Sequence, residues 1–147
     1  MSKNLIACLV FSLSLISVAD CVQKRGNPDA DQAGETERTI KGKVLVTNRL
    51  DIDFSKHLVT FIELGADRCI PCKAMQPIMK EIAETYADRV QVVFYDVWKD
   101  PEPARKYGIQ LIPTQVFIDQ KGNEIFRHVG LFPKEEILAL LKKQGVH

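Results

Sequence analysis

Cys69 and Cys72 are separated by two residues, Ile70 and Pro71, in a Cys-Ile-Pro-Cys run. The run lies where a strand-like apolar segment has ended and a helical pattern begins. At a helix N-terminus, free backbone N–H groups and the positive end of the helix dipole favour a thiolate over a thiol. We therefore expect a lowered pKa at Cys69, with Cys72 one turn on and able to resolve a mixed disulfide. Pro71 suits the first helical turn, where a backbone N–H is not needed.

Other interpretations of the cysteine pair are open at this point. It could be a structural disulfide, although so short a loop stabilises little. It could be half of a zinc site, but zinc takes about four ligands, and His57, His128 and His147 are scattered singly. It could also be two unrelated buried cysteines. A Cys-x-x-Cys run within a strand–helix–strand pattern favours redox chemistry, and no metal site is predicted.

Residues 1–19 have the pattern of a signal peptide. Lys3 precedes the apolar run LIACLVFSLSLISV, which is shorter than the roughly 20 residues of a membrane-spanning helix, and small residues lead up to Ala19. One alternative is a lipoprotein signal with Cys21 as the lipid-modified first residue, although Asp20 stands where a small residue is expected. Another is an uncleaved anchor. Each version predicts export to the periplasm or cell envelope, where disulfides persist.

The rest of the chain divides into a linker and one domain. Residues 20–43 are polar and charged and almost free of large apolar residues, which predicts a flexible linker. Residues 44–147 are enough for a single domain. The net charge of +1 provides no basic excess for binding nucleic acid.

The apolar periodicity predicts an α/β domain with a mixed central sheet of four to five strands and helices on both faces. The first helix pattern covers Lys73–Ala87, with Pro77 inside it as an expected kink. A strand–helix–strand start implies a parallel, right-handed crossover, and a final hairpin adds antiparallel strands. The expected strands are Val44–Val46, Leu58–Leu64, Val90–Val97, Thr114–Ile118 and Glu124–Val129, and the other helices are Pro103–Tyr107 and Lys134–Lys143.

Four segments resemble the thioredoxin family, in family order and at family spacing. They are FIELGADRCIPCKAMQP (Phe61–Pro77), KYGIQLIPT (Lys106–Thr114), DQKGNE (Asp119–Glu124) and HVG (His128–Gly130). The resemblance spans about Val44 to the C-terminus. It implies the thioredoxin fold and a thiol-disulfide oxidoreductase that acts on protein disulfides or dithiols without a bound cofactor.

The resemblance implies a role for each matching residue. Cys69 matches the exposed nucleophile and Cys72 the buried resolving cysteine, with a redox-active disulfide between them. Pro113 matches a cis proline whose loop lies against the cysteines, and the backbone of Ile112 would pair with an extended substrate segment. Gly130 matches a glycine that lines the same groove. An ordinary turn proline and an ordinary turn glycine are the alternatives.

Glu63 is a carboxylate inside an apolar strand, where the family often has a buried acid. Burial would raise its pKa and let it exchange protons with Cys72 near neutral pH. An exposed position at a sheet edge is the alternative. The lysine that often partners this acid would fall near Phe94 and is missing there.

Several residues depart from the family pattern. Arg68 and Ile70 stand where cytosolic thioredoxins carry Trp and Gly, and Gly65 replaces a family aromatic. Arg68 could stabilise the Cys69 thiolate, and Ile70 makes the rim of the site apolar. Lys73 could also favour the thiolate, with a solvated helix lysine as the alternative.

The sequence therefore predicts an envelope thiol-disulfide oxidoreductase, with reduction preferred because the dipeptide and the buried acid resemble reducing members. Its electron donor would be a membrane or soluble thiol protein. A second hypothesis is a binding protein on the same fold, either a copper chaperone, since thiolates bind Cu(I) well, or a non-catalytic assembly factor. No His or Met stands in an obvious ligand position near the pair. We expect a monomer, and in the lipoprotein alternative a lipidated Cys21 would anchor it to the membrane.

Overall fold

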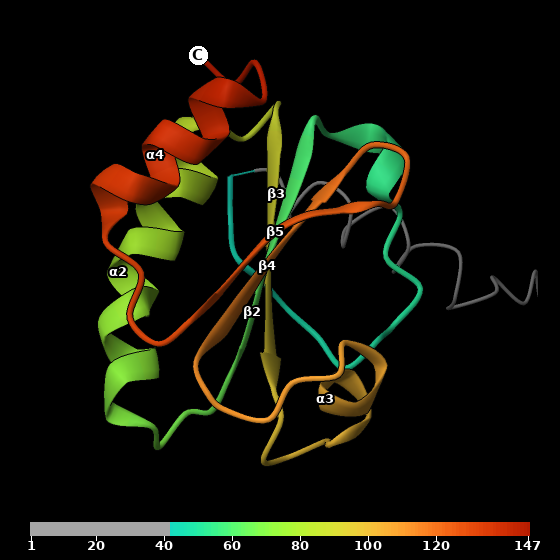
Figure 1. Ribbon diagram of the computed structural model, residues 1–147, viewed down its shortest axis with the longest axis vertical. Helices are drawn as coiled ribbons and strands as arrows, with labels where there is room; N and C mark the ends of the chain where they lie inside the picture. The colour runs from blue at the N-terminus through green and yellow to red at the C-terminus, as the bar shows by residue number, and fades with distance from the viewer. Residues whose placement is uncertain (1–41) are drawn as a thin grey trace, which may run out of the picture.

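A computed structural model describes residues 42–147, so the predicted signal peptide, Cys21 and nearly all of the predicted linker lie outside the described residues. Within it, one mixed sheet has the strand order β1-β3-β2-β4-β5 (Figure 1). The strands are β1 (Leu45–Val46), β2 (Val59–Gly65), β3 (Val90–Asp96), β4 (Thr114–Asp119) and β5 (Glu124–Val129). β3 runs parallel to both β1 and β2, whereas β4 is antiparallel to β2 and to β5. This is the thioredoxin fold that the sequence predicted.

In residues 42–147, three α-helices flank the sheet: α2 (Ile70–Thr85), α3 (Glu102–Lys106) and α4 (Lys134–Lys143). α2 and α4 lie on one face of the sheet, and the short α3 lies on the other side (Figure 1). None of the helices in residues 42–147 is long and apolar enough to cross a membrane.

The first helix begins earlier than the periodicity predicted, at Ile70 instead of Lys73. In its first turn Ile70 and Pro71 are exposed, and the buried residue is Cys72, which the apolar periodicity did not include in the helix. Capping by Cys69 and the proline in the first turn define the start instead. Pro77 lies inside the helix without ending it.

The larger core lies between the sheet and the α2–α4 layer. β2 and β4 are buried on both faces, as their nearly continuous apolar runs predict. Phe61 of β2 stacks on Phe117 of β4, with ring centroids 4.7 Å apart. The helices contribute apolar side chains that meet these rings, namely Met75, Met79, Ile82, Ile137 and Leu141.

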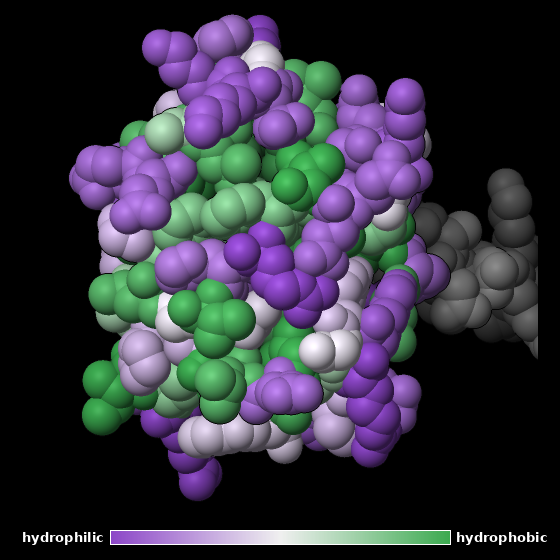
Figure 2. Space-filling view, viewed as in Figure 1, coloured by the Kyte–Doolittle hydropathy of each residue, from purple (hydrophilic) through white to green (hydrophobic). Residues whose placement is uncertain are grey.

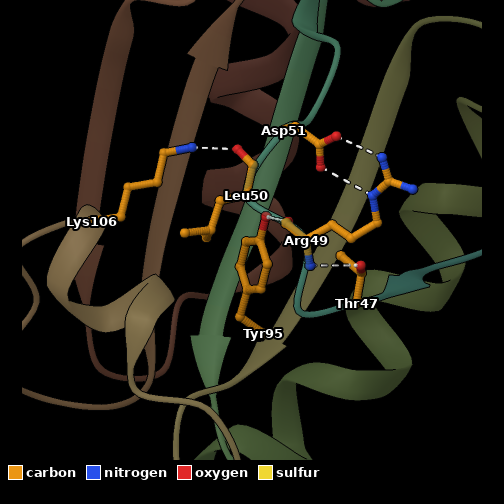
Figure 3. Close-up of polar contacts among 6 residues, drawn as sticks. All are labelled: Thr47, Arg49, Leu50, Asp51, Tyr95 and Lys106. Carbon is orange, nitrogen blue, oxygen red and sulfur yellow. Dashed lines mark hydrogen bonds and ion pairs between the residues drawn. The ribbon is translucent and has the colours of Figure 1, made fainter.

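The segment of residues 47–56, which ends in the 3-10 helix η1 (Phe54–Lys56), packs on the opposite face of the sheet, and we call it the strap. Side chains of β3 and α3 hold its backbone (Figure 3). The Tyr95 hydroxyl donates to the Arg49 carbonyl at 2.6 Å, and the Lys106 ammonium donates to the Leu50 carbonyl. Hydropathy patterning did not identify the strap as an element, although Leu50, Ile52 and Phe54 alternate with aspartates and pack on this face.

Candidate active site

Cys69 and Cys72 lie at the N-terminus of α2, joined in a disulfide with their Cα atoms 5.2 Å apart. Cys69 is the N-cap residue, with extended backbone angles, and its sulfur accepts a hydrogen bond from the Cys72 backbone N–H at 3.3 Å. Cys69 keeps 8% of its surface exposed and Cys72 none. Cys69 is thus less exposed than the resemblance implied, although it is the more accessible of the two sulfurs. Once the disulfide is reduced, this N–H and the helix dipole would favour a thiolate at Cys69.

Two loops approach the disulfide from the sheet side. The Ile112–Pro113 peptide bond is cis, and Ile112 packs against Cys69 and Cys72. Gly130 reaches the same loop, since its N–H donates to the Pro113 carbonyl at 2.8 Å. Gly130 has a φ of +97°, which favours glycine at this turn. The structure therefore brings the cysteine pair, the Ile112–Pro113 loop and Gly130, which are far apart in sequence, to one end of the sheet.

Glu63 is completely buried on β2. Burial raises the pKa of its carboxyl to about 8, against the opposing effect of a hydrogen bond from Gln115. This bond runs from Gln115 Nε2 to Glu63 Oε2 at 3.5 Å. The alternative of an exposed glutamate at a sheet edge is thereby excluded. A group with this pKa can both accept and release a proton near neutral pH.

Gly65 connects the acid to the resolving cysteine. Glu63 and Gly65 are two residues apart on one strand, so they face the same side of the sheet. A Cβ atom on Gly65 would lie 3.2 Å from Cys72 Sγ and 3.1 Å from the Phe94 ring. Phe94 is also the β3 residue in register with Glu63. The two family departures noted separately in the sequence, at Gly65 and Phe94, are therefore neighbours in space.

Two residues of the site were missed by sequence reasoning. Gln115 is buried on β4 in register with Glu63. Its signal was a polar residue inside an apolar strand, the same signal that singled out Glu63. Asp96, at the end of β3, has a side chain that is 7% exposed and links two loops beside the cysteines.

The Asp96 carboxylate accepts hydrogen bonds from the backbone N–H groups of Asp67, Trp98 and Lys99, at 3.1–3.2 Å. The Lys99 ammonium pairs with both Asp96 and Asp67. An open cavity of about 340 Å³ is lined by Asp67, Arg68, Asp96, Trp98 and Lys99. Because Arg68 directly precedes Cys69, this cavity lies next to the disulfide.

The surface around the disulfide is rich in exposed apolar side chains. Ile70 is 82% exposed on the first turn of α2, and Leu111, just before the cis-proline loop, is 67% exposed. Trp98 and Leu131 are also largely exposed. Hydrophobic side chains reach the surface at the lower left of Figure 2, over the start of α2 and the segment that leads into α4. Arg68 and Lys73 are exposed beside them, and Pro71 is exposed on the same turn.

Residues 42–147 contain no group of three or more His, Cys, Asp or Glu side chains that could hold a metal ion.

A helix-capping dithiol after the central strand, facing a cis-proline loop, defines a redox protein of the thioredoxin fold. The family model named thioredoxin matches residues 43–143. The chain therefore belongs to the thioredoxin family, and it is a thiol-disulfide oxidoreductase of thioredoxin type.

The relatives agree with this assignment. Thioredoxin 1 of Synechococcus elongatus is 32% identical over 111 residues, covering 76% of this chain and 94% of that protein. A thioredoxin of Staphylococcus aureus is 31% identical over 96 residues, covering 63% of this chain and 91% of that protein. Among solved structures, a thioredoxin of Nicotiana alata superposes with a TM-score of 0.61 and 30% identity, covering 69% of this chain and 92% of that one.

Proposed function

We propose that the protein reduces protein disulfides in the cell envelope, with Cys69 as the nucleophile and Cys72 as the resolving cysteine. The observation that carries the proposal is the position of Cys69 as the N-cap of α2, where its sulfur accepts the Cys72 N–H. The reduced Cys69 thiolate attacks one sulfur of the substrate disulfide. A Cys69–substrate disulfide forms, and the other substrate sulfur leaves as a thiolate.

The second step needs a thiolate at Cys72. Glu63 accepts the Cys72 proton, and the resulting thiolate attacks Cys69 Sγ. The Cys69–Cys72 disulfide forms and the substrate leaves as a dithiol, two electrons richer. A thiol donor protein then reduces the disulfide, and Glu63 returns the proton to Cys72. The burial of Glu63, which raises the pKa of its carboxyl to about 8, supports both directions of this transfer.

The apolar rim supports an extended protein segment as the substrate. Ile70 and Leu111 flank the disulfide with exposed side chains, and Arg68 adds a cation beside the nucleophile. Ile112 packs against the cluster that contains both cysteines, which supports a role for its backbone in pairing with a bound segment. Pro113 contributes no N–H at this point, and Gly130 leaves the groove open beside it.

The activity test is reduction of insulin disulfides with a dithiol donor. Cys69→Ser should abolish turnover. Cys72→Ser should retain the first attack and accumulate a mixed disulfide at Cys69. Cys21→Ser, which removes a cysteine outside the site, is the matched control and should reduce insulin like the wild type. Equal activity of Cys69→Ser and the wild type would overturn the proposal.

The direction of electron flow is tested by the reduction potential of the Cys69–Cys72 pair. A value near about −270 mV supports a reductant, whereas a value near about −120 mV would identify an oxidant. Equilibration with glutathione of known ratio, read out by thiol alkylation and mass, provides the measurement.

The export part of the proposal rests on the sequence of residues 1–19. In the predicted organisation, the linker of residues 20–43 and the domain of residues 44–147 follow this signal. Expression of the full chain in a bacterium, followed by fractionation, should place it in the envelope. Labelling with a lipid precursor separates the two signals: label lost in Cys21→Ser indicates a lipoprotein, and absent label with a new N-terminus at Asp20 indicates ordinary cleavage. A full-length chain in the cytosol would contradict export.

A further inference from the structure

Gln115 is a completely buried amide between Glu63 of β2 and His128 of β5, its register partners on the neighbouring strands. It lies on β4 directly opposite Glu63 of β2, and Gln115 Nε2 donates to Glu63 Oε2 at 3.5 Å. Burying an amide costs free energy unless its polar atoms find partners. The bond to Glu63 is the partnership that the structure provides within residues 42–147, so the two side chains form one buried unit.

The other neighbours of Glu63 leave this unit isolated. Phe94, in register on β3, offers an apolar ring. The titratable groups that the packed elements direct toward this part of the sheet are Cys72 from α2, Asp96 at the end of β3, and His128 of β5, which is in register with Gln115. His128 stacks on Phe132, and its Nε2 lies 3.3 Å from the Leu131 carbonyl oxygen. Asp96 is held by backbone N–H groups and by Lys99. Among the described residues, Gln115 is therefore the side chain that hydrogen-bonds the Glu63 carboxyl.

Two buried oxygens of the unit, Glu63 Oε1 and Gln115 Oε1, have no hydrogen-bond partner. Both are acceptors when Glu63 is ionised. When Glu63 is protonated, its O–H becomes a donor, and the amide oxygen of Gln115 can accept a hydrogen bond from it. A lysine at this position could partner only the carboxylate, because it has donors alone. An amide has both a donor and an acceptor, so it can serve both protonation states.

We propose that Gln115 is a positioning residue for proton transfer between Cys72 and Glu63. Its N–H holds the carboxylate while the S–H bond of Cys72 breaks and an O–H bond forms on Glu63. Its carbonyl oxygen then accepts the new O–H. The electron pair left on Cys72 attacks Cys69, as in the proposed reaction, on which this inference rests.

The test replaces Gln115 with leucine, which is similar in size but cannot donate. The pKa of the Glu63 carboxyl is measured by carbon NMR in the reduced protein. The Gln115 N–H bond to the charged carboxylate is stronger than a bond between two neutral groups, so losing Gln115 should raise this pKa from about 8 to about 9. The pH profile of the resolving step, followed by stopped-flow, should move to higher pH by the same amount. An unchanged pKa and profile in folded Gln115→Leu would overturn the proposal.

Gln91→Leu is the matched control, since Gln91 is a half-buried glutamine on β3 in register with Thr60, away from Glu63. It should leave the pKa of Glu63 unchanged. If Gln115→Leu does not fold, Gln115→Met keeps the unbranched chain without the amide and is read in the same way.

A double variant distinguishes a role of Gln115 in positioning the Glu63 carboxyl from a purely structural role of Gln115. In a Glu63→Gln background, Gln115→Leu should no longer move the pH profile, and an equal movement there would overturn the proposal. The NMR measurement needs no catalytic turnover, so it tests the effect of Gln115 on the pKa of Glu63 even if insulin reduction proves independent of Cys69. Failure of the inference and failure of the proposed function are thus distinguishable.

Discussion

Gly65 and Cys72 are in direct contact at the end of β2, where a Cβ atom on Gly65 would lie 3.2 Å from Cys72 Sγ. The strand that carries Glu63 therefore approaches the buried sulfur as closely as a backbone can. Phe94 occupies the remaining space, with its ring 3.1 Å from the same point. The glycine thus allows an apolar ring, the sulfur and the strand to meet.

Gly65→Ala should crowd this contact. Cys72 is held by the helix, so Phe94 has to give way, and we expect the free energy of unfolding to fall by about 1–3 kcal/mol. Urea denaturation of the oxidised protein measures this loss. Phe94→Leu, which shortens the opposing side chain, should make the effect of Gly65→Ala smaller in the double variant. Strictly additive losses would contradict the contact.

Glu63 should make stability depend on pH. Its pKa is about 8 in the folded protein, above the ordinary value of 4.5. Its contribution is therefore fully present below about pH 4.5 and is lost as the pH rises through 8. Relative to Glu63→Gln, the wild type should lose a few kcal/mol between pH 5 and 9. Urea denaturation across this pH range measures the free energy of unfolding of both proteins. A difference between them that does not change with pH would contradict the prediction.

Phe94→Lys should place a cation opposite Glu63 in the β2–β3 register. An opposite charge favours the carboxylate, so the pKa of Glu63 should fall well below 8. Carbon NMR of the carboxyl group reports this change. Phe94→Leu, which removes the ring without adding charge, should keep the pKa above its ordinary value. If both variants shift it equally, loss of the ring and not the added charge is responsible.

Asp96→Asn should loosen the loops beside the disulfide. Burial opposes the charge of Asp96, but hydrogen bonds from Asp67, Lys99 and Trp98 prevail and lower the pKa of this carboxyl. Its contribution is present above pH 3.8, the ordinary value, and is lost as the pH falls through the lower folded value. We expect a loss of about 1–3 kcal/mol at pH 7, measured by urea denaturation.

Asp100→Asn is the control for Asp96, because half-buried Asp100 accepts a hydrogen bond from the Glu102 N–H and is less buried than Asp96. It should cost less stability than Asp96→Asn. Equal losses would show that Asp96 has no special role in holding the loops.

The sequence by itself determined the cysteine spacing, the order of strands and helices and the family resemblance, because hydropathic period and local motifs are written along the chain. It also marked Glu63 as a polar residue in an apolar strand. The sequence did not predict the strap, although Leu50, Ile52 and Phe54 alternate with aspartates, because its carbonyls bond to the side chains of Tyr95 and Lys106 and not to a neighbouring strand.

Only the tertiary structure decided which side chains meet. Gln115 partners Glu63 because β4 is antiparallel to β2 in one particular register, and a shift by one residue would turn Gln115 to the other face. Gly65 touches Cys72 because α2 begins at Ile70 and brings the sulfur back over the strand. Both contacts depend on pairing between segments distant in sequence, which local periodicity cannot encode.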